Sequence, residues 1–305
     1  MAVRLHVDRI ELPGHGAIAL DGSGSSGAGR FDAGATAHRG WGSGSRSGVG
    51  DATRWDWWVG TGEGGPLRAV RLVFTIADVV GRLRMLRHGY QSWSPNDVAE
   101  FGVDRDRSLL DGSVEFIRAL NQADQRIVDA PDELRSEWFT LLVDDTGEPW
   151  FIGFDGGELH DGTLRLRRGP TGIELHCEAF LGDLVLAPGE HRALHELVVA
   201  SSAEADALLG AWASRVGDRG RARLGSDLQI GWCSWYHYFH DVTERDIESN
   251  LRLADDWPFD VFQVDDGYQS AIGDWLTTNE RFPGGVEAMA TAIAIRKRRL
   301  RSSPR

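Results

Sequence analysis

The feature that most constrains the fold is a regular alternation of apolar and polar residues along the first two thirds of the chain. Apolar residues occupy every second position in three segments, 70–76, 164–166 and 173–179. Successive side chains of a β-strand point to opposite faces, so this period of two predicts strands with one buried face and one face toward water. Turn-forming sequences punctuate these runs, at 144–147, 168–170 and 187–189. Many short strands separated by turns predict a large antiparallel β-sandwich.

Residues 14–50 are rich in glycine and serine, with the run GSGSSG at 22–27. A glycine-rich cradle for phosphate requires a strand before it and a helix after it, and the flanking residues indicate neither. We therefore expect a flexible loop over this segment.

A helix is expected after the sandwich. Ser202 is a favourable N-cap, and Gly217 and Gly220 are expected to end the helix. Between them, apolar residues recur at helical spacing, namely Ala205, Leu208, Leu209, Trp212 and Val216. The sandwich domain with its linker helix is therefore assigned to residues 1–216.

The pattern then changes to strand, helix, strand. Residues 228–235 and 259–264 are apolar, strand-like runs, and Thr243 to Asp246 is a capping box that starts a helix between them. Such a βαβ unit implies two parallel strands joined by a right-handed crossover. A second helix is expected from about Gly285.

Composition excludes several classes of protein. The net charge of −13 argues against binding to nucleic acid, because an acidic surface repels phosphate. A membrane span requires about 18 uncharged apolar residues in a row, which the sequence lacks. The first 13 residues do not resemble a secretory signal, and two cysteines provide no disulfide framework, so we expect a cytoplasmic protein. The 12 tryptophans suit either stacking on sugars or filling a β core.

The candidate site lies where the two parallel strands end, since ligands gather at that edge of βαβ units. Trp235 could stack on a sugar ring, while Asp265 and Asp266 accept hydrogen bonds from its hydroxyls. An ordinary core tryptophan and a solvated or helix-capping acid pair are the structural alternatives. Gly267 lets both carboxylates turn toward one ligand. Adjacent residues could not flank a glycosidic bond from opposite sides at about 5–5.5 Å, so we expect recognition from them and not cleavage.

Three further residues have a spacing that could suggest zinc, namely Cys233, His237 and His240. No additional cluster of ligands occurs nearby in the sequence. We therefore expect neither a metal nor a cofactor.

Together, these strand-end segments strongly resemble glycoside hydrolase family 36, which contains bacterial α-galactosidases and plant raffinose and stachyose synthases. The matching segments are GWCSWY at 231–236, VTERDI at 242–247, FDVFQVDDGYQ at 259–269 and IGDW at 272–275. Upstream, HGYQSWS at 88–94 looks like the sandwich-domain motif of the family, and 136–138 and 153–157 fit the same domain more loosely. The resemblance covers roughly residues 70 to 292.

The resemblance implies a β-sandwich followed by a (β/α)8 barrel, and a retaining hydrolase of terminal α-galactosides. Asp265 and Asp266 match the acid pair that binds the 4- and 6-hydroxyls of the sugar, and Trp235 matches the aromatic residue that packs against it. Trp93 is expected to close the pocket, and Tyr268 is included among the substrate-binding residues. Family members often form tetramers, so the expected partners are an α-galactoside and further copies of the chain. A galactosyl transglycosylase, or a non-catalytic carbohydrate-binding or degenerate product, are the alternatives.

The sequence also departs from the family. A (β/α)8 barrel needs about 250 residues, so the stretch from Leu228 to Arg305 has room for only two barrel strands. The family nucleophile and acid/base belong to later strands, so no catalytic residue is assigned here. We interpret 217–292 as the start of the barrel and the basic segment 293–305 as the result of a frameshift or a truncated gene model. A solvated helix end, or a basic tail for nucleic acid or anionic membrane, are the other readings of that segment.

Overall fold

The computed structural model describes residues 4–20, 30–39, 52–91, 94, 96–103, 133–225, 228–254, 257 and 259–302. The chain divides into two compact units, Met1–Ala222 and Arg223–Arg305, which we describe separately. The assignment of domains at 1–216, 217–292 and 293–305 stays a prediction.

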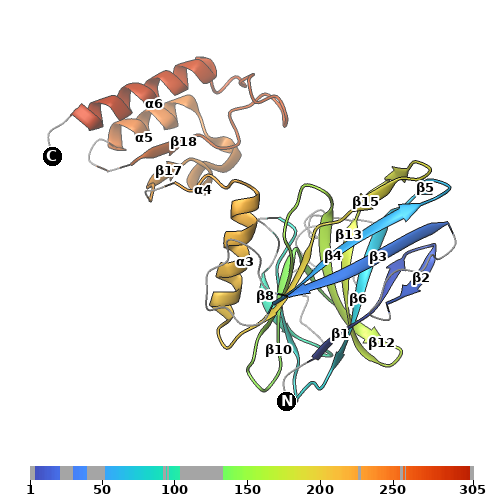
Figure 1. Ribbon diagram of the computed structural model, residues 1–305. Coiled ribbons are helices and arrows are strands. Elements are labelled where there is room, and N and C mark those ends of the chain that lie inside the picture. The colour runs from blue at the N-terminus through green and yellow to red at the C-terminus, as the bar shows by residue number, and fades with distance from the viewer. Residues whose placement is uncertain are drawn as a thin grey trace. The chain divides into compact units, whose positions relative to one another are not determined.

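The first unit is a sandwich of two antiparallel sheets (Figure 1). The six-stranded sheet has the order β2 (Gly16–Ala19), β1 (Arg4–Leu12), β6 (Ala69–Ala77), β13 (Gly172–Phe180), β12 (Asp161–Gly169) and β9 (Leu134–Glu137). The eight-stranded sheet has the order β15 (His191–Ala193), β4 (Ala52–Thr61), β16 (Leu197–Ser201), β11 (Trp150–Phe154), β10 (Phe139–Val143), β7 (Arg84–Arg87) and β8 (Asp97–Glu100), with β3 (Phe31–Arg39) also paired to β4. A short ribbon joins β5 (Gly65–Pro66) to β14 (Val185–Leu186).

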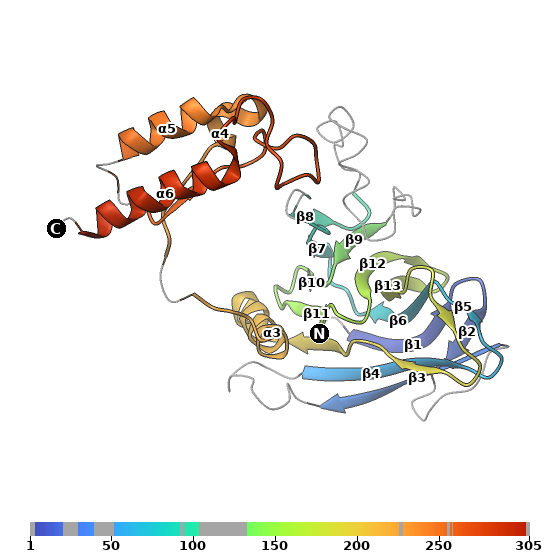
Figure 2. The ribbon, with the colours of Figure 1, turned by 90° about the horizontal axis from the view of Figure 1, so that it is seen from above.

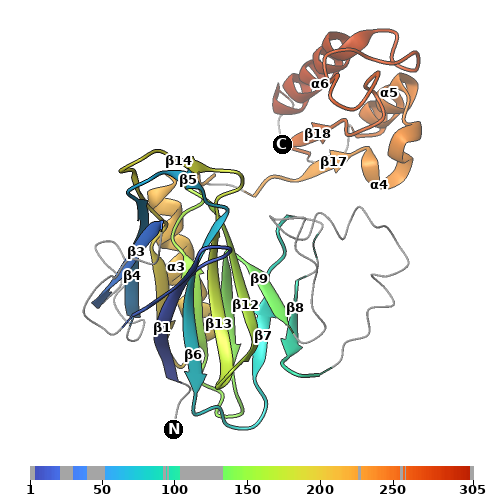
Figure 3. The same cartoon turned by 90° about the vertical axis from the view of Figure 1, so that its right-hand side faces the viewer.

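The predicted alternation is confirmed in the core between the sheets. Every second residue of β6 and β13 faces that core, and Leu72, Leu175 and Cys177 are completely buried there. Figure 3 shows β6, β13 and β12 side by side. The hairpin between β12 and β13 closes at the pair Gly169 and Gly172, at the turn expected from 168–170.

The opposite face of the six-stranded sheet corrects the sequence-based prediction. We expected Glu174, His176 and Glu178 to face water, but all three are buried, with at most 4% of their surface exposed. Charged partners from neighbouring strands explain this burial, because a carboxylate leaves water only when it is paired. Arg165 donates to Glu178 at 2.8 Å, and Arg9 donates to Glu174 at 3.0 Å.

The prediction of a loop over residues 14–50 is wrong for the strands β2 and β3. β2 pairs with β1, and β3 pairs with β4 over nine residues. Neighbouring strands therefore supply the hydrogen bonds that the glycine-rich composition did not suggest. The run 22–27 lies outside the described residues.

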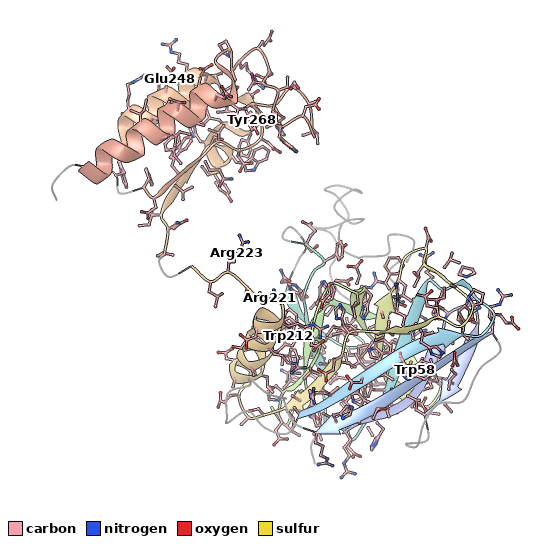
Figure 4. The ribbon with its side chains drawn as sticks, turned by 45° about the horizontal axis from the view of Figure 1, so that its top comes forward. Trp58, Trp212, Arg221, Arg223, Glu248 and Tyr268 are labelled. Carbon is pink, nitrogen blue, oxygen red and sulfur yellow. The ribbon has the colours of Figure 1, made fainter. Side chains whose placement is uncertain are left out.

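The predicted linker helix is confirmed as α3 (Ala205–Arg219), and so is its end at Gly220, while the predicted N-cap and the role of Gly217 need correction. Its N-cap is Glu204 in place of Ser202, and Gly217 lies inside it, with Gly220 as the C-cap. Contacts with the sheet stabilise the helix, which continues past Gly217. Leu208 packs on β11, and Trp212 donates from its indole nitrogen to the Phe154 carbonyl at 2.8 Å (Figures 2 and 4).

The second unit contains the predicted strand–helix–strand arrangement. β17 (Gly231–Cys233) and β18 (Val261–Gln263) are parallel, and α5 (Glu244–Leu253) connects them. Thr243 forms the predicted capping box, accepting from the Asp246 N–H at 3.2 Å while its own N–H donates to the Asp246 carboxylate at 3.0 Å. α4 (Trp235–Tyr238) and a 3-10 turn (Phe239–Asp241) follow β17.

Two helices cover one face of this strand pair. α5 and α6 (Gly285–Ser302) contribute Ile247, Leu251 and Met289 to a core that also includes Trp232 and Phe262. The last two are neighbours across the strands, with rings stacked at 4.1 Å. The described residues contain two parallel strands and no closed barrel, so the (β/α)8 barrel stays a prediction.

Helix α6 continues into the basic segment that begins at residue 293. None of the described helices combines the length and the apolar composition that crossing a lipid bilayer requires.

One buried acid at the end of β9 makes the stability of the sandwich depend on pH. Glu137 has 1% of its surface exposed, and its Oε2 accepts from the Thr163 hydroxyl at 2.7 Å. Its Oε1 is buried and has no hydrogen-bond partner among the described residues. Burial raises the pKa of Glu137 to about 7, because water no longer stabilises the carboxylate.

We expect Glu137→Gln to stabilise the protein at pH 8 and to have little effect at pH 4.5 or below. A raised pKa means that the folded protein holds this proton more tightly than the unfolded chain, so wild-type stability falls as pH rises from about 4.5 to about 7. Glutamine cannot ionise and keeps the bond from Thr163. The gain in the free energy of unfolding should reach up to about 3 kcal/mol, measured by urea unfolding at several pH values. The exposed Glu148→Gln is the control, and a gain that did not change with pH would contradict the explanation.

Candidate functional site

The ends of β17 and β18 are joined by the residue that follows β17. The Ser234 N–H donates to the Gln263 carbonyl at 3.1 Å, and the Ser234 hydroxyl accepts from the Asp265 N–H at 2.9 Å. Ser234 is completely buried, so water does not compete for these bonds. The residue before Trp235 is thereby held against the predicted acid pair.

Asp265 is the anchored member of that pair. Its Oδ2 accepts from the Cys233 thiol at 3.3 Å and from the Gln263 amide at 3.0 Å, and its Oδ1 accepts from the Asp266 N–H at 2.9 Å. Burial raises the pKa of the Cys233 thiol, and the neighbouring Asp265 carboxylate raises it further. A carboxylate offers about four acceptor positions, so one position on Asp265 is left for a ligand hydroxyl.

Asp266 is the unengaged member of the pair. No hydrogen bond or ion pair from a described residue reaches its carboxylate, which is partly exposed. The turn is completed by Gly267 at φ +115°, a conformation that side chains with a Cβ rarely adopt. A Cβ at this position would also lie 2.9 Å from the His240 carbonyl oxygen. Gly267 therefore allows the acid turn to lie directly against the loop that follows β17.

The sequence predicted that Trp235 lies at the end of the first strand, but it begins the short helix α4 instead. Its ring is half-buried and meets Phe239 at 5.3 Å and His240 at 4.8 Å, both edge to face. Phe239 has φ +51°, which costs a non-glycine residue about 1–3 kcal/mol. The same loop that orients Trp235 thus presses its His240 backbone against Gly267.

Asn279 donates hydrogen bonds to the backbone of the acid turn, a role that was not predicted from the sequence. Its amide nitrogen donates to the Gly267 carbonyl at 2.8 Å and to the Gln269 carbonyl at 3.3 Å. Arg281 also donates to the Gly267 carbonyl, at 3.4 Å. These contacts fix the backbone of the acid turn, and no sequence signal near Asn279 indicated them.

Tyr268 is engaged in supporting contacts. Its hydroxyl donates to the Trp275 carbonyl at 3.2 Å, and its ring meets Phe282 edge to face at 6.3 Å (Figure 4). Its role in substrate binding stays a prediction. Trp93, the residue expected to close the pocket, lies outside the described residues.

The residues considered for zinc take other roles. Cys233 donates to Asp265, while the ring of His237 packs on Tyr238 at 4.5 Å. Across the described part of the chain, no group of three or more His, Cys, Asp and Glu side chains is placed to hold a metal ion.

The arrangement suits the binding of a polyol. An exposed edge of the strand pair presents a half-buried indole ring, one carboxylate of fixed direction and one unengaged carboxylate. Indole rings stack on apolar C–H faces, and carboxylates accept hydrogen bonds from hydroxyl groups. Both carboxylates come from one turn, so they are close enough to bind neighbouring hydroxyls of one ligand.

Comparisons with known proteins concern the fold. No protein-family model matches the sequence. An α-galactosidase from Thermus thermophilus, solved with stachyose, is 21% identical, with 90% of this chain and 50% of that chain covered and a TM-score of 0.52. An α-galactosidase from Lactobacillus brevis is 10% identical, with coverages of 97% and 40% and a TM-score of 0.55. A family 36 α-galactosidase from Geobacillus stearothermophilus, solved with 1-deoxygalactonojirimycin, is 13% identical, with coverages of 97% and 42% and a TM-score of 0.50.

The resemblance to family 36 is therefore confirmed at the level of the fold. The antiparallel sandwich matches the N-terminal sandwich of these α-galactosidases. The chain spans half or less of the length of the solved structures that it matches.

We expect Ser234→Ala to destabilise the second unit, because the substitution leaves the Asp265 N–H without its buried acceptor. The free energy of unfolding should fall by about 1–3 kcal/mol, measured by urea unfolding. The Asp265 amide should also exchange its proton with solvent faster. Ser270→Ala, at an exposed position whose hydroxyl has no described bond, should change stability by less than about 0.5 kcal/mol. Equal effects of the two substitutions would show that Ser234 does not join the strand ends.

Proposed function

We propose that this chain is the sugar-recognising part of a glycoside hydrolase of family 36, whose whole enzyme acts on terminal α-galactosides. The observation that carries the proposal is the pair of carboxylates on one turn, of which Asp265 is anchored and Asp266 is unengaged. The likeness of fold to α-galactosidases supports the same sugar. The (β/α)8 barrel that would complete the site is part of this proposal.

Galactose differs from glucose in its axial 4-hydroxyl, and this difference suits the anchored acid. Asp265 accepts from three protein donors, so its remaining acceptor position has a fixed direction. Glucose would leave that partly buried acceptor unpaired, which costs about 1–3 kcal/mol. Asp266 then accepts from the neighbouring 6-hydroxyl, and Trp235 covers the apolar face of the ring.

The pair is assigned to recognition and not to cleavage. In a retaining glycosidase, two carboxyl groups face each other across the scissile bond at about 5–5.5 Å. Asp265 and Asp266 are adjacent in one turn, so they cannot face each other from opposite sides of a scissile bond. The nucleophile and the acid/base are therefore residues other than these two.

We expect Asp266→Asn to weaken galactose binding about 10- to 100-fold, because a hydrogen bond to a charged group contributes about 1.5–3 kcal/mol. Binding of galactose and glucose to the 305-residue protein would be measured by ligand-observed NMR and calorimetry. Asp274→Asn, in the exposed loop after the acid turn, removes the same charge and should leave the affinity unchanged. Equal losses in both variants, or equal affinities for galactose and glucose in the wild type, would contradict the proposed sugar site.

A non-catalytic carbohydrate-binding role is the second candidate, and the acid pair itself favours it for the chain taken alone. We expect the purified chain to bind galactose without releasing nitrophenol from p-nitrophenyl α-galactoside. Turnover that disappears in Asp266→Ala would show that the chain carries its own catalytic residues and would overturn this expectation.

A further inference from the structure

Cys233 occupies a defined place in the strand pair. Cys233 and Gln263 are register partners across β17 and β18, one step beyond the pair Trp232 and Phe262. Side chains one residue apart on a strand point to opposite faces. Trp232 and Phe262 stack beneath the helices, so Cys233 and Gln263 lie on the other face, where both donate to Oδ2 of Asp265.

The two donors differ in how firmly they are held. The Gln263 side chain is exposed, so water competes for its amide. The Cys233 side chain is half-buried and has one rotatable bond before its sulfur atom. Its thiol is the weaker donor of the two, but it is partly buried and its position is fixed by the strand. Among the described residues, Asp265 is the charged group that faces the thiol, and the Trp235 backbone N–H approaches it from the following loop.

We propose that Cys233 is a positioning residue for the acid pair, whose thiol fixes the direction of the Asp265 carboxylate toward the sugar. The proposal rests on the function proposed above, since it assigns Cys233 to the same site. The thiol keeps its proton and donates it to Oδ2. An ionised or alkylated Cys233 could not donate, and a thiolate would repel the carboxylate.

The contact itself can be tested without any sugar. In a Cys177→Ala background, Cys233 is the only thiol, so alkylation by iodoacetamide reports on it alone. We expect Asp265→Asn to speed alkylation at pH 8 about 3- to 10-fold, because removing the carboxylate stabilises the reactive thiolate. Asp274→Asn in the same background should leave the rate unchanged. An unchanged rate in Asp265→Asn would overturn the proposal, whether or not the protein binds galactose.

The positioning role is tested by the affinity for galactose. Cys233→Ala should weaken binding about 5- to 10-fold, and Cys233→Ser should restore most of the affinity, because a hydroxyl also donates to Asp265. Wild-type affinity should fall above the raised thiol pKa, whereas that of Cys233→Ser should not. Equal affinities of the alanine variant and the wild type would overturn the role. A protein that shows the thiol–carboxylate coupling but binds no galactose would refute the proposed function and leave the contact between Cys233 and Asp265 established.

Discussion

The second unit depends on one buried hydroxyl group. β17 and β18 have three residues each, and such short strands form too few backbone bonds to fix the loops that follow them. Ser234 accepts from the Asp265 N–H inside the unit, and its own N–H donates to the Gln263 carbonyl. Both loops that carry candidate ligand-binding residues therefore start from one fixed point. This connection fixes the start of the segment that carries Trp235 relative to the start of the acid turn.

In the sandwich, the outer face of the six-stranded sheet carries charged side chains that are buried. These charges need partners to offset their loss of hydration. Arginines from β1, β6 and β12 pair with glutamates of β13 across that face. Each partner of such a pair depends on the other, since removing one of them leaves a buried charge without compensation and destabilises the sheet. Glu137 is a buried acid that is only partly paired, because one of its oxygens has no hydrogen-bond partner among the described residues.

Features whose causes are local in the sequence could be predicted, and features that depend on distant residues could not. The core-facing residues of β6 and β13 and the capping box at Thr243 follow from neighbouring residues, and these predictions were correct. β3 was missed because its hydrogen bonds come from β4, and Glu178 was placed in water because its arginine partners lie on other strands. At the site, the motif singled out the two acids for which a sugar-binding role is proposed. The contact that anchors Asp265 joins residues 32 positions apart, so the sequence pattern could not show it.

In the proposed sugar site, the unequal states of the two acids would help to distinguish one sugar from its close isomers. A freely moving carboxylate could follow a hydroxyl from an axial to an equatorial position and would discriminate poorly. An acceptor whose direction is fixed by protein donors cannot follow, so the wrong isomer leaves it unpaired at a cost of about 1–3 kcal/mol. Specificity therefore requires that some acceptor positions of Asp265 be occupied by hydrogen bonds from the protein. Asp266, whose carboxylate accepts from none of the described residues, remains able to contribute affinity. One anchored and one unengaged carboxylate can therefore combine specificity with affinity, which two carboxylates in the same state could not.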